Sequence, residues 1–541
     1  MANKKIKDLP QLKDITDDIK LPTGGAGDYA VTIAQLKQLI LQYVPNGKVE
    51  DGSKEAINGS QLLAVINSIK TLEELSKQLK RTSQMNGDYS PLLNETDKTF
   101  IVDSVVTLDK SAEVVAKLAF ENGGLLKVTN SSTLSLNNVL AIDNQKIISY
   151  PATCHVSFKN TPRVSMGWFD NTDEQSGDYG YIVNDLINSS DNNGRVIYFP
   201  NKDYLIKRPI NLIDKSFITL YGDGYGQKSN IEYEKKPPFG NGLVTTYPSS
   251  GAKLMLHKDS SNIVFRGTST NRGFRSSGIC IKGLTFSGHN SPSVAQAGIR
   301  IEEDNDGYMI QDNVFINFRG FGLFIKGNDA MTIRGNWVCE CENPLYIQGG
   351  KESMIQNNMF GAFPTGISCD IQEQVRLNFS GNNIPPDGSV GLNLNKVRHS
   401  LFNNNVITGR FTGLVYILGS YCNIFGGNIL KIPQDEETSA NSKDPKNRGV
   451  DYDVLRIEQS DDNIISDTQI LAYLDSNKGV TINLIKSKNN ILSNVRITNK
   501  IHSDDTVVIS KDSPTNQLFN VCRKTELNDL AEHTDILAYR A

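Results

Sequence analysis

The sequence predicts an all-β chain whose main body is a right-handed parallel β-helix. Short apolar segments recur at a regular spacing through the second half of the chain, and asparagines recur in step with them. Hydrophobic residues make up 38% of the 541 residues, and glycine occurs 44 times. This composition is poor in core residues for a helix-rich protein and suits a fold of many short strands and turns.

The apolar segments set the length of the repeat. A repeat in the low twenties, with two or three short alternating strands, fits one coil of a parallel β-helix. A leucine-rich repeat has a similar length, but its leucine consensus is absent from this sequence. The segments begin at Gly298, Gly322, Pro344, Gly366, Gly391 and Gly413, so that successive spacings are 24, 22, 22, 25 and 22 residues.

A second register of asparagines accompanies these segments. Asparagine tolerates the left-handed backbone of tight turns, and its side-chain amide can bond to the asparagine one coil away. We therefore interpret this column as part of the scaffold and not as a functional site. Its members, each preceding an apolar pair, are Asn313, Asn336, Asn358, Asn383, Asn405 and Asn428.

The sequence divides into five expected parts. The stack should start with a capping amphipathic helix at about Tyr181 to Ser190, because an open end would expose unpaired strand edges. A polar insertion at 433–453 interrupts the repeat and is either a recognition loop or a disordered excursion. The parts are an N-terminal module at 1–48, a coiled-coil segment at 49–95, a β-rich connector at 96–165, the β-helix body at 166–520 and a tail at 521–541.

The second part carries apolar residues at heptad spacing. Leu62 and Ile69 occupy a positions, and Val65, Leu72 and Leu79 occupy d positions, which makes one seam that needs partner helices. The alternative is a single amphipathic helix packed on its own domain. The preceding segment EAINGSQL resembles the neck of trimeric autotransporter adhesins. That resemblance implies a short trimeric coiled coil and a homotrimer.

The first part resembles the N-terminal stretches of phage tail fibres and tailspikes. The resemblance rests on DLPQLKDITDDIKLP and on YAVTIAQLKQLI, which follows it. It implies docking to phage tail or baseplate proteins. The expected location is therefore the virion, assembled in the host cytoplasm.

Charge and cysteine content narrow the expected partners. Lys and Arg number 56 against 60 Asp and Glu, which argues against nucleic acid as a partner. No apolar run approaches the length of a signal-peptide core or a membrane span, so we expect no membrane insertion. The seven cysteines are expected to be reduced and mostly buried. No Cys-His cluster is present, so we expect neither a metal nor a cofactor.

From about Gly177 to Leu474 the chain resembles inulin fructotransferase, a β-helical enzyme that splits fructan intramolecularly. The resemblance rests on GRVIYFPNKDYLI, FITLYGDGYG and IKGNDAMTIRGNWVCECENPLYI. It implies a pectate-lyase-like solenoid and a trimer. The two catalytic acids of that family flank a stretch that corresponds here to CECEN. In an ungapped match they fall on Gly335 and Tyr346, whereas the acid between them is retained as Glu340.

The segment Val338 to Glu342 carries the first candidate acids. Strand alternation should send Cys339 and Cys341 to one face and Glu340 and Glu342 to the other. Residues two apart on a strand are roughly 6.5 to 7 Å apart, near the lower limit for a pair of inverting carboxyl groups. The alternative is solvated charge on an exposed strand. We expect Glu340 to act in catalysis, together with Glu342 or Asp370.

The first strand of each coil supplies the candidate substrate-binding residues. Aromatic side chains cover the apolar C–H patches of sugars, and amides and charges bind their hydroxyls. The alternative is an ordinary sheet that faces solvent or the trimer. Alternation predicts an outward column of Glu302, Lys326, Gln348, Asp370 and Asn395, with Arg300, Phe324, Tyr346 and Ser368 alongside.

Together with the resemblances, these patterns predict a homotrimeric phage tailspike that binds and cleaves a bacterial surface polysaccharide, such as a capsule or an O-antigen. The expected activity is endo-glycosidic, with elimination by a lyase as the less favoured route. Two alternatives stay open. One is an adhesin that binds the glycan on the same scaffold without cleaving it, and the other is a fructan-processing enzyme.

Overall fold

The computed structural model describes most of the chain beyond residue 78. Side chains are described at 79–96, 98–121, 123–170, 177–190, 194–224, 251–257, 276–288, 296–303, 305–362, 366–385, 390–408, 413–431, 453–471, 480–498 and 507–521. Only the backbone is described at 20–21, 31–32, 263–268, 472, 499, 527–529 and 535–537. The predicted coiled coil and the 433–452 part of the insertion lie outside these residues. In the described part of the chain, no helix has the length and apolar character needed to cross a membrane.

The chain divides into two compact units, one of residues 1–106 with 114–124 and the other of 107–113 with 125–541. The first unit contains β1 (Lys20–Leu21) paired antiparallel with β2 (Val31–Thr32). Strand β3 (Leu79–Arg81) pairs parallel with β4 (Thr99–Val102), and β4 pairs with the end of β6 (Ala112–Phe120). The unit also holds η4 (Thr82–Gln84) and α3 (Ser90–Asn94).

The start of β3 corrects one sequence expectation. Leu79 was assigned the last d position of the coiled coil, but it is the first residue of a strand. The guanidinium of Arg81 binds the carboxylates of Asp103 at 3.2 Å and Glu121 at 2.7 Å. Residues 79–81 are therefore held in a β-sheet, and the heptad pattern does not continue as a helix to Leu79.

The second unit begins with short strands and a capping helix. The strands are β5 (Val105–Leu108), β7 (Leu125–Val128), β8 (Thr133–Leu140), β9 (Ile148–Ser149) and β10 (His155–Phe158), followed by η5 (Met166–Trp168). Helix α4 (Gly180–Asn188) buries Tyr181, Ile182, Leu186 and Ile187. The predicted amphipathic helix at the start of the stack is thus confirmed.

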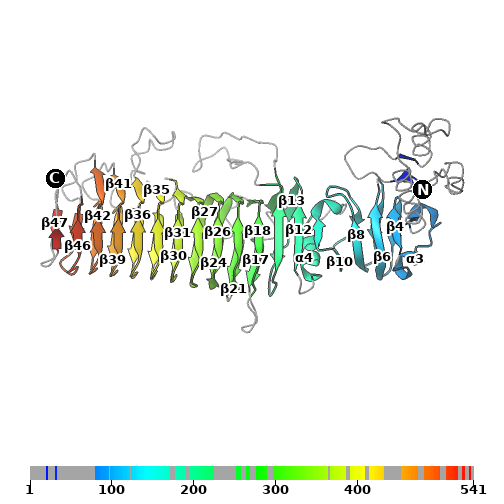
Figure 1. Cartoon of the computed structure of the whole chain (residues 1–541), viewed down its shortest axis with the longest axis horizontal. Helices are drawn as coiled ribbons and strands as arrows, with labels where there is room; N and C mark the ends of the chain where they lie inside the picture. Colours follow the sequence, from blue (N-terminus) through cyan, green and yellow to red (C-terminus); the bar gives the residue numbers. More distant parts are fainter. Residues whose placement is uncertain are drawn as a thin grey trace, which may run out of the picture. The chain divides into compact units, whose positions relative to one another are not determined.

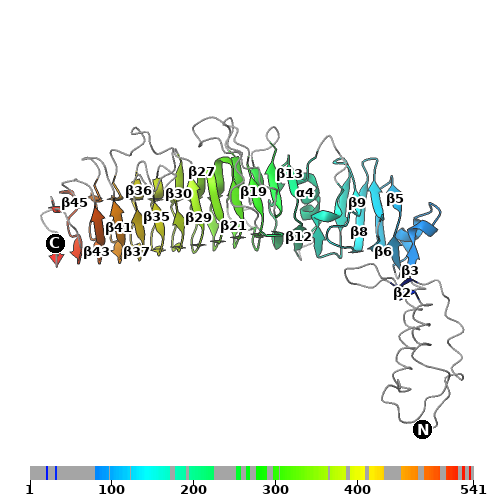
Figure 2. The same ribbon diagram turned by 90° about the horizontal axis from the view of Figure 1, so that it is seen from above.

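The body is a parallel β-solenoid, seen from the side in Figures 1 and 2. Each coil contributes one strand to a fourteen-stranded parallel sheet, which we name face A. Its strands are β11 (Arg163–Ser165), β12 (Arg195–Phe199), β15 (Ile218–Gly222), β18 (Cys280–Lys282), β22 (Met309–Gln311), β26 (Thr332–Arg334), β28 (Met354–Gln356), β31 (Asn378–Ser380), β34 (Leu401–Asn403), β37 (Ile424–Gly426), β40 (Ile464–Ser466), β43 (Ile491–Ser493), β46 (Gln517–Phe519) and β48 (Asp535–Leu537).

A second sheet of the body has 22 strands and supplies two further faces. Face B consists of β13 (Asp203–Ile206), β16 (Lys253–Leu256), β19 (Thr285–Ser287), β23 (Val314–Ile316), the start of β27 (Trp337–Gln348), β29 (Met359–Ala362), β32 (Asn383–Ile384), β35 (Val406–Thr408), β38 (Ile429–Lys431), β41 (Gln469–Ala472) and β44 (Arg496–Asn499). Face C consists of β14 (Ile210–Asn211), β17 (Ile263–Thr268), β20 (Gln296–Glu302), β24 (Phe318–Lys326), the end of β27, β30 (Ile367–Gln372), β33 (Val390–Asn395), β36 (Gly413–Leu418), β39 (Leu455–Glu458), β42 (Ile482–Ile485), β45 (Val507–Ile509) and β47 (Leu527–Asp529). Two short strands, β21 (Asn305–Asp306) and β25 (Asn328–Asp329), pair between faces C and A.

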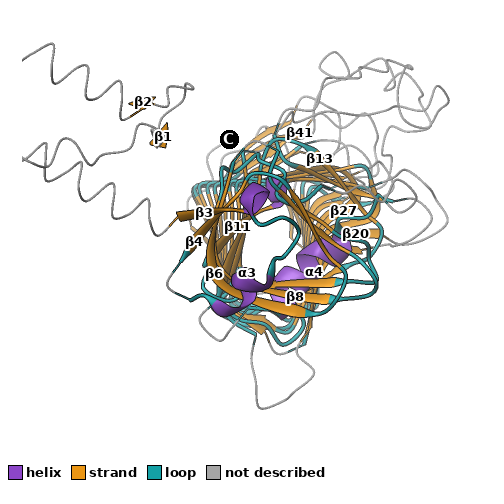
Figure 3. Ribbon diagram, turned by 90° about the vertical axis from the view of Figure 1, so that its right-hand side faces the viewer, coloured by secondary structure: helices purple, strands orange, loops and turns teal. Residues whose placement is uncertain are grey.

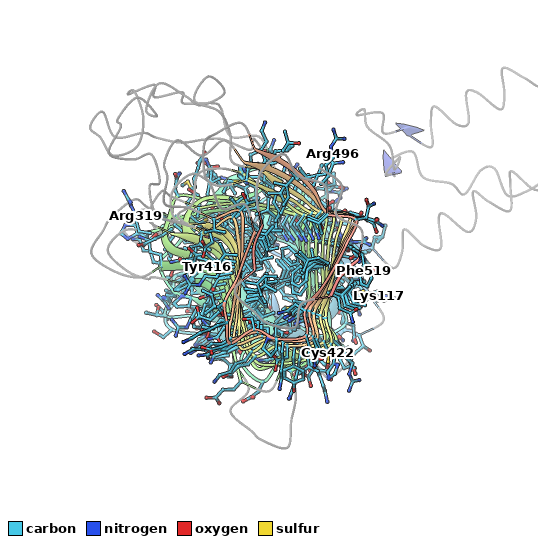
Figure 4. All side chains as sticks on the ribbon, turned by 90° about the vertical axis from the view of Figure 1, so that its left-hand side faces the viewer. Lys117, Arg319, Tyr416, Cys422, Arg496 and Phe519 are labelled. Carbon is cyan, nitrogen blue, oxygen red and sulfur yellow. The ribbon has the colours of Figure 1, made fainter. Side chains whose placement is uncertain are left out.

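The strands form a ring when the body is viewed along the stack (Figure 3). Alternation along each strand fills the inside of this ring with buried apolar side chains. Phenylalanines stack from coil to coil, with ring centroids 5.8 Å apart for Phe379 and Phe402 and 4.7 Å apart for Phe402 and Phe425. Viewed along the stack in Figure 4, Tyr416 of face C, Arg496 of face B and Phe519 of face A lie on three different sides. The predicted parallel β-helix is confirmed.

The asparagine column lies inside the turn between faces A and B. Each buried side-chain amide donates to the Oδ1 atom of the next, for example from Asn358 to Asn382 at 3.0 Å and from Asn382 to Asn405 at 3.2 Å. The prediction was off by one residue in this coil. Asn382 is buried and belongs to the column, whereas Asn383 starts strand β32 and is exposed. A second column follows between faces C and A, formed by Asn423, Asn463, Asn490 and Asn516.

These neighbouring asparagines provide a matched test of the column. Asn382→Ala should lower the free energy of unfolding by about 2 to 5 kcal/mol, because it removes the acceptor of two buried Asn358 N–H groups and the amide that donates to Ile355 and Asn405. Asn383→Ala should change it by no more than about 0.5 kcal/mol. Urea titration followed by circular dichroism measures both. Equal losses in the two variants would contradict the assignment.

Candidate functional site

Glu340 lies at a β-bulge inside strand β27. The pairing of β27 with β29 shifts between Cys339, which is opposite Gly361, and Cys341, which is opposite Ala362. Glu340 is the extra residue and has a left-handed backbone with φ of 57°. A bulge interrupts the alternation of a strand and re-aims its side chains.

This bulge corrects the predicted alternation of the segment. Cys339 and Cys341 are both buried, but they do not share a face. A Cβ atom on Gly361 would meet the Sγ atom of Cys339 at 3.1 Å, on the side opposite the buried ring of Phe360. Cys341 is instead completely buried. Glu340 and Glu342 are half-buried, and the regular outward pair assumed for them is absent because the bulge separates them.

The outward column on face C also differs from the predicted one. Asp370 pairs with Tyr346, and Gln372 pairs with Gln348, so Asp370 belongs to the row of Arg300, Phe324 and Tyr346. The predicted column had placed Asp370 beside Gln348, and Ser368, predicted to lie alongside, is completely buried. The prediction counted the alternation from the glycine that starts each segment. The register is set instead by the residues that face inward. Cys369 pairs with Leu345, which places Asp370 opposite Tyr346.

The aromatic residues of this row are stacked along the solenoid. The rings of Phe324 and Tyr346 are 4.9 Å apart and nearly parallel, and the guanidinium of Arg300 lies 4.5 Å from the Phe324 centroid. Arg300 also binds Glu302 at 2.7 Å, and the Lys326 ammonium lies 5.2 Å from the Phe324 centroid. Phe324 is buried by these neighbours, so its ring faces are covered and are not available to a sugar. Tyr346 donates from its hydroxyl to Gln348 at 2.8 Å.

Asp370 is the acidic residue of this row, and it lies next to Tyr346. Its carboxylate accepts hydrogen bonds from the Asn393 amide at 2.9 Å and from the Gln372 amide at 3.0 Å. Burial raises the pKa of the Asp370 carboxyl, and these two hydrogen bonds oppose the rise. A carboxyl with a raised pKa retains its proton closer to neutral pH, which suits a general acid.

A second acid of this kind occurs on the same face, and the sequence did not single it out. Asp453 accepts a hydrogen bond from Asn483 at 2.9 Å, and the Arg456 guanidinium lies 3.7 Å away. Burial raises the pKa of Asp453 against these two interactions. Between the two acids the row continues through Asn393 and Tyr416 to Arg456. Three coils separate Asp370 from Arg456, or about 14 Å.

The predicted acids are therefore not brought together within one chain. On β27, Glu342 lies four residues before Tyr346, which is about 13 Å along the strand. Asp370 lies beside Tyr346 on the next coil. Paired carboxyl groups of glycosidases lie about 5 to 9.5 Å apart. Glu340 lies still earlier on β27. Asp370 could be joined by Glu340 or Glu342 only if those residues come from a neighbouring chain.

A polar groove lies where face A turns into face B. Its volume is about 370 Å³. Glycines leave room beside the polar side chains of adjacent coils, since a Cβ atom on Gly335 would meet Oδ1 of Asp312 at 2.4 Å. Three of its residues, Asn336, Asn358 and Asn383, belong to the asparagine register seen in the sequence, but that register was interpreted as scaffold and not as a groove. The groove is lined by Asp312, Gly335, Asn336, Trp337, Asn357, Asn358, Met359, Gly381 and Asn383. Among the described residues, no group of three or more His, Cys, Asp or Glu is arranged to hold a metal ion.

The raised pKa of Asp370 predicts a dependence of stability on pH. The folded protein binds the Asp370 proton more tightly than the unfolded chain does. The protonated carboxyl therefore contributes to stability below its ordinary pKa of 3.8, and this contribution is lost as pH rises through the pKa of the folded protein. Asp370→Asn should therefore raise the free energy of unfolding at pH 7, and the gain should shrink towards pH 3. Urea titrations across this range measure it, with exposed Glu373→Gln as the control. A gain independent of pH would contradict the assignment.

Comparison with known proteins shows that the body is similar to β-helical proteins that act on carbohydrates. A family model described as rhamnogalacturonase A/epimerase, pectate lyase-like, matches residues 171–368. The DFA-I-forming inulin fructotransferase of Arthrobacter globiformis is 23% identical over 360 residues, which cover 62% of this chain and 88% of that protein. The predicted resemblance to inulin fructotransferase is thus confirmed as a distant similarity.

Solved structures agree on the fold. The DFA-IIIase of Arthrobacter chlorophenolicus, without its lid and in complex with GF2, superposes with a TM-score of 0.54 at 21% identity, covering 64% of this chain and 89% of that one. The same enzyme without its lid gives a TM-score of 0.53 at 20% identity, with 67% and 96% covered. The chain is therefore a pectate-lyase-like parallel β-helix with distant relatives that are enzymes acting on polysaccharides.

Proposed function

We propose that this protein is a polysaccharide-processing enzyme, with fructan as the first substrate class to consider and Asp370 as its general acid. The observation that carries the proposal is the half-buried Asp370 carboxyl, with its raised pKa, in an outward row of amides, charges and aromatics. The similarity of the body to an inulin fructotransferase supports the substrate class.

The chemistry assigned to Asp370 is proton donation to the glycosidic oxygen as the glycosidic bond breaks. The amides of Asn393 and Gln372 orient the carboxyl, and they stabilise the carboxylate that forms once the proton has left. The partner that activates the attacking hydroxyl or water is a second acid. We assign this role to Glu340, with Glu342 as its neighbour, reaching the site from another chain of a homotrimer.

The groove beside Trp337 supports a neutral glycan over an acidic one. Its lining includes the carboxylate of Asp312 and several asparagine amides but neither Lys nor Arg, and every residue of this lining is described. An acidic sugar would meet uncompensated repulsion there, whereas hydroxyl groups find donors and acceptors. A neutral, hydroxyl-rich polymer such as fructan fits this chemistry.

A second candidate function places the same body on a phage tail, where it would cleave or only bind a capsule or O-antigen. It is favoured by the EAINGSQL segment and by the N-terminal stretch that resembles tail fibres and spikes. Both segments lie outside the described residues. The attachment to tail or baseplate proteins belongs to this candidate, whereas the homotrimer is common to both.

A glycan panel separates the two candidates. The purified full-length protein is incubated with inulin, levan, bacterial capsules and O-antigens, and oligosaccharides are detected by mass spectrometry. Products from inulin or levan alone would support the fructan enzyme, and products from a surface glycan alone would support the tailspike. Absence of any product, together with retention on a surface glycan, would support the adhesin and overturn an enzymatic function.

Binding can be followed in the same samples by tryptophan fluorescence. The chain has two tryptophans, of which Trp168 is buried and Trp337 lines the groove. A neutral glycan in the groove should change the emission, and Trp337→Phe should abolish the change.

Three substitutions test the assigned roles in catalysis. Asp370→Asn and Glu340→Gln should each lower the rate roughly a hundredfold or more, because a catalytic acid or base contributes about 10² to 10⁴ in rate. Glu303→Gln is the matched control, since Glu303 is exposed and has a left-handed backbone like that of Glu340. Its activity should stay near that of the unmodified protein. Full activity in Glu340→Gln, with folding checked, would remove Glu340 from the mechanism.

A further inference from the structure

The outer surface of face A lacks charge over half of its length. Seven consecutive strands, from β28 to β46, each present two outward side chains around one buried residue. None of these fourteen described side chains is charged. They are Met354, Gln356, Asn378, Ser380, Leu401, Asn403, Ile424, Gly426, Ile464, Ser466, Ile491, Ser493, Gln517 and Phe519.

The other two faces differ over the same coils. Face B carries Lys431 and Arg496 among its described outward residues, and face C carries Asp370, Arg456 and Glu458. The apolar members of face A are also open to solvent in the single chain. Met354 is 43% exposed and Ile424 is 44% exposed. A long, exposed and uncharged sheet surface is typical of the centre of a protein interface, where charged residues are depleted.

The links that border face A are too short to cover it. Over these coils, five to seven residues connect face C to face A, and two residues connect face A to face B. In these coils the longest link, from Lys431 to Leu455, joins face B to face C instead. Face A therefore lacks a local segment of its own chain that could shield it.

We propose that face A, from Met354 to Phe519, is the surface through which copies of this chain associate. Seven strands extend over ~30 Å, and a three-residue strand with its two edges is ~20 Å wide. The projection of about 600 Å² approaches the roughly 800 Å² per partner of a stable interface, and corrugation by side chains adds to it. A second copy offers a surface of the same length, flatness and lack of charge.

The edges of this surface are polar, as the rim of an interface is. Exposed Arg376 binds Glu352 at 2.5 Å, and exposed Lys396 lies 3.5 Å from Glu373, both in the turns between faces C and A. Arg398, in the same turn as Lys396, donates to the Tyr421 hydroxyl at 2.9 Å. These charges lie along the edge of the uncharged centre that borders face C, and they leave the centre free for close packing. The inference does not depend on the catalytic part of the proposed function.

Thiol labelling of the full-length protein tests the proposal. Ile424→Cys lies at the centre of face A, and Val406→Cys is the control on face B, with exposures of 44% and 37% in the single chain. The labelling rates with a maleimide are compared by mass spectrometry, with the native cysteines as the background, and light scattering gives the mass of the assembly. A mass of several chains, with Ile424→Cys labelled at least tenfold more slowly than Val406→Cys, is the expected result. A single-chain mass or equal rates would overturn the proposal.

A second measurement identifies what covers the surface. A bifunctional maleimide added to Ile424→Cys under slow-labelling conditions should join two chains covalently and should leave Val406→Cys chains separate. Protection of Ile424→Cys without joined chains would mean that another part of the chain or another molecule covers face A, and it would contradict association between copies. Neither readout uses glycan, so failure of the glycan panel leaves this proposal standing. A single-chain mass would also remove the assignment of Glu340 to a second chain, but it would leave Asp370 as the proposed general acid.

Discussion

Every coil of this protein depends on the hydrogen bonds that it makes to the next. Backbone pairing fixes the coils along the stack, and the buried asparagine columns fix the turns between them. Each asparagine in these columns needs its neighbour, because an unpaired buried amide costs about 1 to 3 kcal/mol. The position of every outward side chain follows from this register. The rows on faces A and C are therefore as regular as the turns that hold them.

Periodicity predicted the fold because a parallel β-helix repeats the same demands in every coil. Apolar residues must face inward and turns must recur, and both leave a mark in the sequence. The repeat in the sequence located the turn and inward positions only to within one or two residues. Positions 382 and 383 are both asparagine, so the sequence does not distinguish them. The structure shows that Asn382 is buried and Asn383 is exposed. Asp370 was displaced similarly, because a glycine does not mark the same point of each coil.

The candidate site was predicted less well because its chemistry depends on departures from the repeat. The bulge at Glu340 breaks the alternation from which the outward pair of glutamates was predicted. The segment VCECE contains no residue type that indicates a left-handed backbone inside a strand. The burial of Asp370 arises from neighbours on other coils, which are distant in the sequence. Buried acids of this kind weaken the fold at neutral pH. They are retained where function compensates for the loss.

The unequal links between faces bear on how such a chain can change over time. From β28 to β46 the links on both sides of face A are short, with five to seven residues before face A and two between face A and face B, so long segments are absent from these two edges. The edge between faces B and C already accommodates links of very different length. In these coils, new segments can be acquired there without disturbing the stack, so variation in the molecules that this protein recognises is expected to accumulate along the edge between faces B and C.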